Sequence, residues 1–279
     1  MKPVSDCHVL VTATSYGRSD PRLKLELETA VSRVTYNTSG KPLTSAQLQE
    51  LLPDVDGFIA GLDEIDAAAI MAAPQLRVIA RYGVGINNVD LAAARAQGVV
   101  VTNTPGANSA SVAELTIGLL LNLLRPIQQA ASETRLGGWP CINGVSLVGK
   151  TVGLVGLGAI GKEVARRLAG FDCATVAYDV AADTDFARRH AITLVALDDL
   201  LAVADVVSLH LPVLPETRHM VNAAFLRRMK PGAYLINTSR GELIDEAALP
   251  AALMDGRVAG AALDAFQQEP PGANNPLLA

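Results

Sequence analysis

The sequence has 279 residues, enough for one large domain or two medium domains at about 150 residues each. Half of the residues are hydrophobic and only 18% are charged, which excludes a disordered chain. The formal net charge is −5, so the composition lacks the excess of basic residues that is typical of nucleic-acid-binding proteins.

Short runs rich in Val, Ile and Leu alternate with helical patterns along the whole chain. We predict strands over residues 8–13, 57–60, 77–81, 99–103, 151–155, 175–178, 206–211, 233–237 and 260–263. These runs are continuously apolar, which is typical of parallel strands whose two faces are both covered by helices. The sequence therefore predicts an α/β fold built from doubly wound parallel sheets.

A break in this pattern near Thr104 indicates a boundary between two domains, which we place at 1–103 and 104–279. The apolar run over residues 112–124 contains Glu114 and is shorter than the roughly 20 residues that cross a membrane, so we expect a buried helix and no membrane. The apolar run at the start is too short for a signal peptide. Three widely spaced cysteines fit neither a disulfide framework nor a zinc site, so we expect a cytoplasmic protein without a bound metal.

The segment TVGLVGLGAIGKEV places three glycines, Gly156, Gly158 and Gly161, between a predicted strand and a predicted helix. Glycines at this spacing form a tight turn, let the backbone approach a pyrophosphate and allow the helix to pack closely on the strand. Asp179 ends the next predicted strand, where a carboxylate accepts hydrogen bonds from an adenosine ribose. The combination predicts dinucleotide binding and favours NAD over NADP, with a packing corner that binds no ligand as the alternative.

Other glycine-rich or polar clusters also follow predicted strands, and open parallel sheets bind ligands outside the carboxyl ends of their strands. These clusters are residues 83–85, 104–106, 210–212 and 237–241, together with Asp264. Arg240 offers a planar fork suited to a carboxylate and an adjacent carbonyl group. Glu269 is suited to orienting a histidine. The alternatives are a surface ion pair for Arg240 and an exposed loop position for Glu269.

Six segments carry a resemblance that covers nearly the whole chain in order and spacing. They are RYGVGINNVD, NTPGANSASVAELTIGLLL, GLGAIG, SLHLPVLPETRHMVN, LINTSRGELIDEAAL and GAALDAFQQEPP. The sequence resembles the NAD-dependent D-2-hydroxyacid dehydrogenases, most closely the D-3-phosphoglycerate dehydrogenase branch. The resemblance implies two Rossmann-like domains, with a substrate-binding domain (1–103) before an NAD-binding domain (104–279) that carries a dimerisation segment. It further implies hydride transfer between NAD and C2 of a D-2-hydroxy acid or 2-oxo acid, in a homodimer.

The same motifs imply roles for individual residues. Arg240 would bind and polarise the 2-oxo acid, and Glu269 would pair with a catalytic histidine. The implied substrate-binding residues, besides Arg240, are Gly83, Val84, Gly85 and Asn108. The implied cofactor-binding residues are Gly156, Gly158, Ala159, Ile160, Gly161, Asp179, Leu211, Pro212, Thr238, Ser239 and Asp264.

The sequence departs from the family pattern at its end. Family members continue past NPLL to a Pro-His pair, whose histidine is the general acid, and to a helix that returns to the first domain. This sequence stops at Ala279, before both. None of its four histidines matches that motif, and we interpret His210 as a structural residue or as a wall of the cofactor site. We expect that the natural chain continues, whereas a chain that ended here would bind NAD and turn over poorly.

A second departure concerns the substrate. The phosphoglycerate branch often has an arginine where this sequence has Gly61, although Arg81 matches a basic position of that branch. A phosphorylated substrate is therefore less favoured, and glyoxylate, hydroxypyruvate or another small 2-oxo acid stays open. An NAD-binding corepressor-like protein or a catalytically impaired family member is the hypothesis from a different class.

Overall fold

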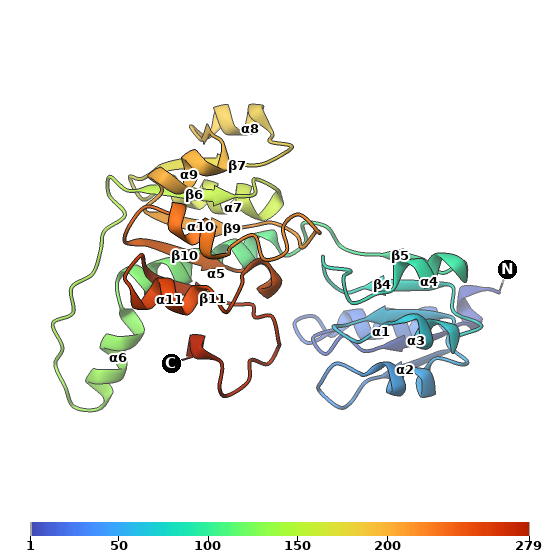
Figure 1. Ribbon diagram of the computed structural model, residues 1–279. Coiled ribbons are helices and arrows are strands. Elements are labelled where there is room, and N and C mark those ends of the chain that lie inside the picture. Colours follow the sequence, from blue (N-terminus) through green and yellow to red (C-terminus); the bar gives the residue numbers. More distant parts are fainter. Residues whose placement is uncertain (1, 279) are drawn as a thin grey trace. The chain divides into compact units, whose positions relative to one another are not determined.

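The computed structural model describes residues 2–278 and divides the chain into two units, Met1–Asn108 and Ser109–Ala279, each with its own sheet (Figure 1). The division falls after residue 108 rather than after residue 103. The intervening turns stay with the first unit, because the Thr104 N–H donates to the Gly83 carbonyl oxygen at 3.0 Å.

The first unit is a five-stranded parallel sheet in the order β2-β1-β3-β4-β5. Its strands are β1 (His8–Val11), β2 (Arg33–Tyr36), β3 (Gly57–Ala60), β4 (Val78–Arg81) and β5 (Val100–Thr102). Its helices are α1 (Arg22–Ala30), α2 (Ser45–Leu51), α3 (Ala67–Met71) and α4 (Leu91–Ala96), preceded by a 3-10 turn, η1 (Val4–Asp6). Three helix starts are capped by side chains that accept backbone N–H bonds, those of Thr44, Asp66 and Asp90.

The second unit is a six-stranded parallel sheet in the order β11-β10-β9-β6-β7-β8. Its strands are β6 (Thr151–Val155), β7 (Ala174–Tyr178), β8 (Thr193–Leu194), β9 (Val206–Leu209), β10 (Ala233–Asn237) and β11 (Val258–Leu263). Its helices are α5 (Ser109–Leu124), α6 (Ile127–Arg135), α7 (Ala159–Leu168), α8 (Thr184–Arg189), α9 (Leu197–Val203), α10 (Ala223–Arg228) and α11 (Leu249–Met254), with 3-10 turns η2 (Gly241–Leu243) and η3 (Pro276–Leu278). Two parallel sheets with alternating helices confirm the predicted α/β fold class.

Both faces of the second sheet are buried by helices. On one face, Leu200 and Leu201 of α9 and Phe225 of α10 lie in one apolar cluster with residues of β9 and β10. On the other, Leu120 of α5 and Val164 of α7 lie in a second cluster with residues of β6. Burial on both sides explains why these strands read as continuous apolar runs.

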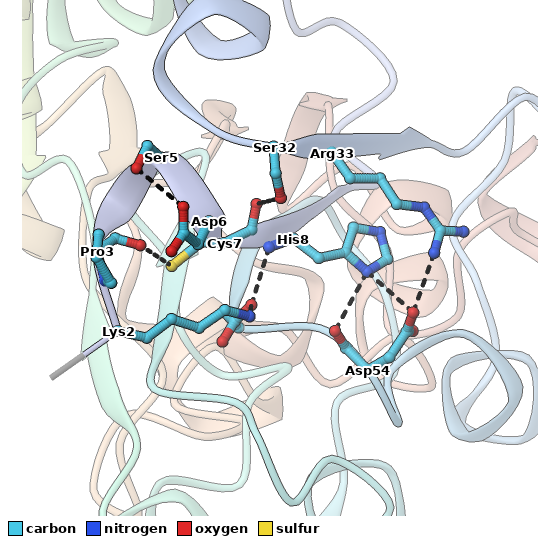
Figure 2. Close-up of polar contacts among 10 residues, drawn as sticks. Lys2, Pro3, Ser5, Asp6, Cys7, His8, Ser32, Arg33 and Asp54 are labelled. Atoms are coloured by element: carbon cyan, nitrogen blue, oxygen red, sulfur yellow. Dashed lines mark hydrogen bonds and ion pairs between the residues drawn. The ribbon is translucent and has the colours of Figure 1, made fainter.

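Polar contacts link residues at the end of the first sheet where β1 and β2 begin (Figure 2). The Nδ1 atom of the His8 ring lies 3.3 Å from the Asp54 carbonyl oxygen. His8 is buried, and its Nε2 lies 2.8 Å from the Thr35 hydroxyl. Asp54 also accepts a 3.0 Å bond from Arg33. These contacts place His8 in a structural role at the edge where β1 and β2 begin.

Helix α6 and the segment after it extend away from their own sheet (Figure 1). No residue of α6 is buried, and Leu136 and Trp139 beyond it are 89% and 92% exposed. Within residues 2–278 no single helix has the length and hydropathy to cross a membrane; α5 and α6 reach the length only together, across a 65° bend.

Candidate active site

The turn between β6 and α7 holds the three glycines of the dinucleotide motif. Gly156 has a φ of +104°, and a Cβ there would lie 2.6 Å from the His210 carbonyl oxygen. A Cβ on Gly161 would lie 2.2 Å from the Gly156 carbonyl oxygen. A Cβ on Gly158 would meet no heavy atom within 4 Å. The structure therefore has no room for a side chain at Gly156 or Gly161. Beside Gly158 there is free space, in which a ligand could approach the backbone.

Helix α7 begins directly after this open glycine, so Ala159 and Ile160 form its first turn. The first N–H groups of a helix have no acceptor within the helix and carry partial positive charge. Such a terminus binds phosphate groups. The residues present thus fit the pyrophosphate of a dinucleotide.

Asp179 follows β7 and lies beside the same turn. Its two carboxylate oxygens accept bonds from the N–H groups of Leu157 (2.7 Å) and Ala181 (2.8 Å). Each carboxylate oxygen has a further lone pair. Asp179 is consequently held in place while it can still accept a hydroxyl bond, as a ribose requires.

The end of β10 is organised by Asn237, which is fully buried. Its side chain donates to the Arg240 carbonyl oxygen (2.8 Å) and accepts from the Ser239 N–H (3.0 Å). The Ser239 hydroxyl donates to the Leu209 carbonyl oxygen at the end of β9 (2.8 Å). Arg240 donates through Nη1 to the Ser239 carbonyl oxygen (2.7 Å). Within residues 2–278, no ion pair involves Arg240 and its other N–H donors have no partner.

Thr238 of the same turn is buried, and its side chain contacts helix α5. Its hydroxyl is 2.8 Å from the hydroxyl of Thr116, which also donates to the Val112 carbonyl oxygen within its helix. Because the Thr116 proton is used within the helix, Thr238 is the donor in the bond between them. This contact fixes the predicted cofactor residue to the helix that covers the sheet.

Gly241 connects Arg240 to the segment that carries Glu269. A Cβ on Gly241 would lie 1.9 Å from the Phe266 carbonyl carbon, so the two backbones touch. The Phe266 N–H in turn donates to Glu269 Oε1 at 3.1 Å. The structure therefore brings the segments of the two predicted catalytic residues together, with Glu269 itself exposed.

Asp264, Leu211 and Pro212 stand at the ends of β11 and β9. The Asp264 N–H donates to the Asn237 carbonyl oxygen (2.9 Å), and desolvation raises the pKa of its carboxyl group. A Cβ on Gly156 would lie 3.0 Å from the Leu211 side chain, so Leu211 lies against the glycine turn. Pro212 is exposed.

His210 lies behind the glycine turn. Its Nε2 is 3.0 Å from the Ser208 hydroxyl, while the buried Nδ1 has no partner in the described part of the chain. Burial lowers the pKa of His210 from 6.5 to about 4. The ring is therefore neutral near pH 7 and cannot supply a proton as an imidazolium.

The predicted substrate residues of the first unit follow β4 and β5. Gly83 has a φ of +153°, and the Val84 carbonyl oxygen accepts a 2.7 Å bond from the Asn103 side chain. Gly85 is half-buried and Asn108, at the end of the unit, is exposed.

In the second unit, the predicted residues converge on five adjacent strands. The glycine motif, Asp179, the 210–212 turn, the 238–240 turn and Asp264 follow β6, β7, β9, β10 and β11. The substrate residues 83–85 and Asn108 belong to the other unit. Sequence reasoning missed the roles of Asn237 and Thr116, whose signal is a single polar side chain in an otherwise apolar strand or helix.

Comparison with known proteins agrees with this arrangement. Residues 117–279 match the model of the D-isomer specific 2-hydroxyacid dehydrogenase NAD binding domain. A glyoxylate reductase of Thermofilum pendens is 42% identical over 258 residues, 88% of this chain and 74% of that protein. A hydroxypyruvate reductase of Thermotoga maritima is 37% identical over 257 residues, 91% of this chain and 83% of that protein. A D-3-phosphoglycerate dehydrogenase of Archaeoglobus fulgidus is 39% identical over 241 residues, 84% of this chain but 46% of that protein.

Comparison with solved structures indicates the same family of enzymes. The pyruvate reductase of Chlamydomonas reinhardtii superposes with a TM-score of 0.83 and 33% identity, covering 95% of this chain and 79% of the other. The family match spans more than half of the chain and contains the glycine motif and Arg240. The chain therefore belongs to the D-isomer specific 2-hydroxyacid dehydrogenases, which are NAD-dependent oxidoreductases.

Proposed function

We propose that this enzyme reduces a small 2-oxo acid, of the size of glyoxylate or hydroxypyruvate, to the 2-hydroxy acid. The observation that carries this proposal is Arg240, anchored by one N–H to its own turn, with its other donors free of partners within residues 2–278. A guanidinium fork held in this way suits a carboxylate next to a carbonyl group. The names of the glyoxylate and hydroxypyruvate reductases among its relatives support the substrate size.

The cofactor site we propose consists of residues whose geometry fits a dinucleotide. Gly156, Gly158 and Gly161, with Ala159 and Ile160, would hold the pyrophosphate, and Asp179 the adenosine ribose. The nicotinamide half would be bound by Leu211, Pro212, Thr238, Ser239 and Asp264. Bound NADH supplies the hydride that reaches C2 of the substrate.

Backbone N–H groups and side chains would both bind the substrate. The loop Gly83–Val84–Gly85 receives the carboxylate through N–H groups, Asn108 contributes on the substrate side, and Arg240 binds and polarises the 2-oxo acid. The fixed guanidinium of Arg240 would stabilise the negative charge that the carbonyl oxygen acquires during reduction. Glu269 would pair with a catalytic histidine, as the family pattern implies, and that histidine would give the carbonyl oxygen its proton. We do not assign this role to His210, whose Nε2 lies 3.0 Å from the Ser208 hydroxyl and whose Nδ1 is buried.

We also propose a homodimer in the cytoplasm. Leu136 and Trp139 support the dimer, because two large apolar side chains that are 89% and 92% exposed lie in one segment. A second subunit would remove this apolar surface from water.

The test is NADH-dependent reduction of glyoxylate and hydroxypyruvate by the wild-type protein and by Arg240→Lys. The lysine keeps the charge but loses the planar fork, so we expect kcat/KM to fall by about 100-fold or more while NADH affinity stays unchanged. Equal kcat/KM for the variant would remove Arg240 from the mechanism. Wild-type protein without activity on any small 2-oxo acid would contradict the proposed function.

A further inference from the structure

The loop that follows β4 has its carbonyl groups turned into the first unit. The Gly83 carbonyl oxygen accepts from the Thr104 N–H (3.0 Å), and the Val84 carbonyl oxygen accepts from the Asn103 side chain (2.7 Å). In a trans peptide, the N–H points opposite to the preceding carbonyl. The N–H groups of Val84 and Gly85 therefore point away from Asn103 and Thr104, and neither has an acceptor within residues 2–278. Two such groups in succession form an anion-binding nest.

Arg81 fixes the start of this loop. Its side chain is 7% exposed, and Nη1 donates to the carbonyl oxygens of Tyr82 (2.6 Å) and Ala60 (3.4 Å). A Cβ on Gly83 would lie 2.8 Å from the same Nη1, so the guanidinium lies directly against the loop. The Arg81 guanidinium thus contacts the backbone of Tyr82 and Gly83, directly before the nest.

The neighbouring strand end leaves no room for a second basic side chain. A Cβ on Gly61, after β3, would lie 3.1 Å from the Ala13 Cα and 3.2 Å from the Thr12 carbonyl oxygen. The Gly61 N–H donates to Asp63, whose carboxylate is fully buried and also accepts the Thr12 hydroxyl and the Leu43 N–H. A buried carboxylate at this place disfavours a second anion nearby.

We propose that Arg81 is a positioning residue, which orients the N–H groups of Val84 and Gly85 toward the substrate carboxylate and does not bind a second acidic group on the substrate. The inference rests on the proposed function, because it assigns the nest to the carboxylate of the 2-oxo acid. It also explains how a basic residue can stand at this strand end in an enzyme for unphosphorylated substrates.

The experiment compares hydroxypyruvate with 3-phosphohydroxypyruvate, two substrates that differ only by the phosphate group. In Arg81→Met we expect KM for both to rise by about tenfold or more, since a charge-assisted buried hydrogen bond is lost. The ratio of the two kcat/KM values should stay within about twofold of wild type, and kcat should change less than KM. Arg81→Lys restores one donor and should recover part of the loss for both substrates.

Arg77→Met is the matched control, because Arg77 is an exposed arginine that directly precedes the same strand, at the end opposite to Arg81. This variant should leave both KM values unchanged. If Arg81→Met does not fold, Asn103→Ala loosens the same loop without a change of charge and should give the same equal loss. A loss confined to the phosphorylated substrate would overturn the proposal, as would an unchanged KM for hydroxypyruvate in an active enzyme. Wild-type protein inactive on both substrates would contradict the proposed function itself.

Discussion

Gly158 and Gly156 are two residues apart, but their different surroundings predict different effects of an alanine substitution on stability and on NADH affinity. A Cβ at Gly158 meets nothing within 4 Å and the φ of −73° suits any residue. We predict that Gly158→Ala folds with wild-type stability and binds NADH at least about tenfold more weakly, because the methyl group occupies the approach to the pyrophosphate. Calorimetric titration with NADH, beside a thermal unfolding curve, measures both quantities.

Gly156→Ala is the contrasting variant. The φ of +104° and the approach of 2.6 Å to the His210 carbonyl oxygen should cost about 2 kcal/mol or more of unfolding free energy. Denaturant unfolding gives this value. NADH affinity equal to wild type in Gly158→Ala would show that the open space at this glycine is not the dinucleotide site.

His210 links its burial to the pH dependence of stability. Its pKa is lowered from 6.5 to about 4, so the unfolded chain binds more protons than the folded one between these values. Stability from this residue is present above pH 6.5 and is lost as the pH falls toward 4, by about 3 kcal/mol in total. We expect His210→Gln to have a flatter stability curve over this range. Parallel curves for the two proteins in denaturant titrations at several pH values would contradict the burial of a neutral imidazole.

At the scale of elements, strands with an apolar run could be predicted, the edge strands β5 and β11 among them, whereas the edge strands β2 and β8 could not. The centre strands β1, β3, β6 and β9 are mostly apolar and almost wholly buried, as expected of parallel strands that are covered on both faces. The edge strand β2, with the sequence RVTY, is only partly buried, and β8 has two residues. Neither has the apolar pattern on which the prediction depends, so both were missed.

The residues of the candidate site also fall into two groups, those that a motif predicts and those whose role only the folded structure shows. The three glycines and Asp179 could be predicted as cofactor-binding residues from their spacing, and the structure places them after the adjacent strands β6 and β7. The role of Asn237 could not, because it depends on hydrogen bonds to Ser239 and Arg240 that only the folded turn defines. Arg81 matched a basic position in the sequence, but only its contacts with Tyr82 and Ala60 point to the loop rather than to a substrate phosphate.

The elements of the first unit are joined at their carboxyl ends by Asp63, from which a stability prediction follows. Its buried carboxylate accepts from the Leu43 N–H (2.8 Å), the Gly61 N–H (2.9 Å) and the Thr12 hydroxyl. In Asp63→Asn, an NH₂ donor replaces one of the two accepting oxygens and faces N–H or O–H donors. The free energy of unfolding should therefore fall by about 3 kcal/mol. Asp54→Asn, at an exposed ion pair with Arg33, is the control and should cost less than about 1 kcal/mol. Equal losses in denaturant unfolding would remove Asp63 from this structural role.

At the scale of the whole molecule, the exposed segment after α6 leads to a prediction about assembly. A homodimer would have twice the chain mass of 29.1 kDa. Leu136→Asp should shift the sedimentation mass toward the single chain, because it places a charge in the apolar contact. Met254→Asp, at a side chain that is equally exposed (89%) on α11, should not. A wild-type protein that sediments as a single chain at micromolar concentration would contradict the dimer.

The dinucleotide turn and Arg240 both support hydride transfer to C2 of a 2-oxo acid. The most direct test uses NADH carrying deuterium at the transferred position, with hydroxypyruvate as substrate and analysis of the product by mass and chirality. We expect D-glycerate with one deuterium at C2. L-glycerate, or D-glycerate without deuterium at C2, would contradict it.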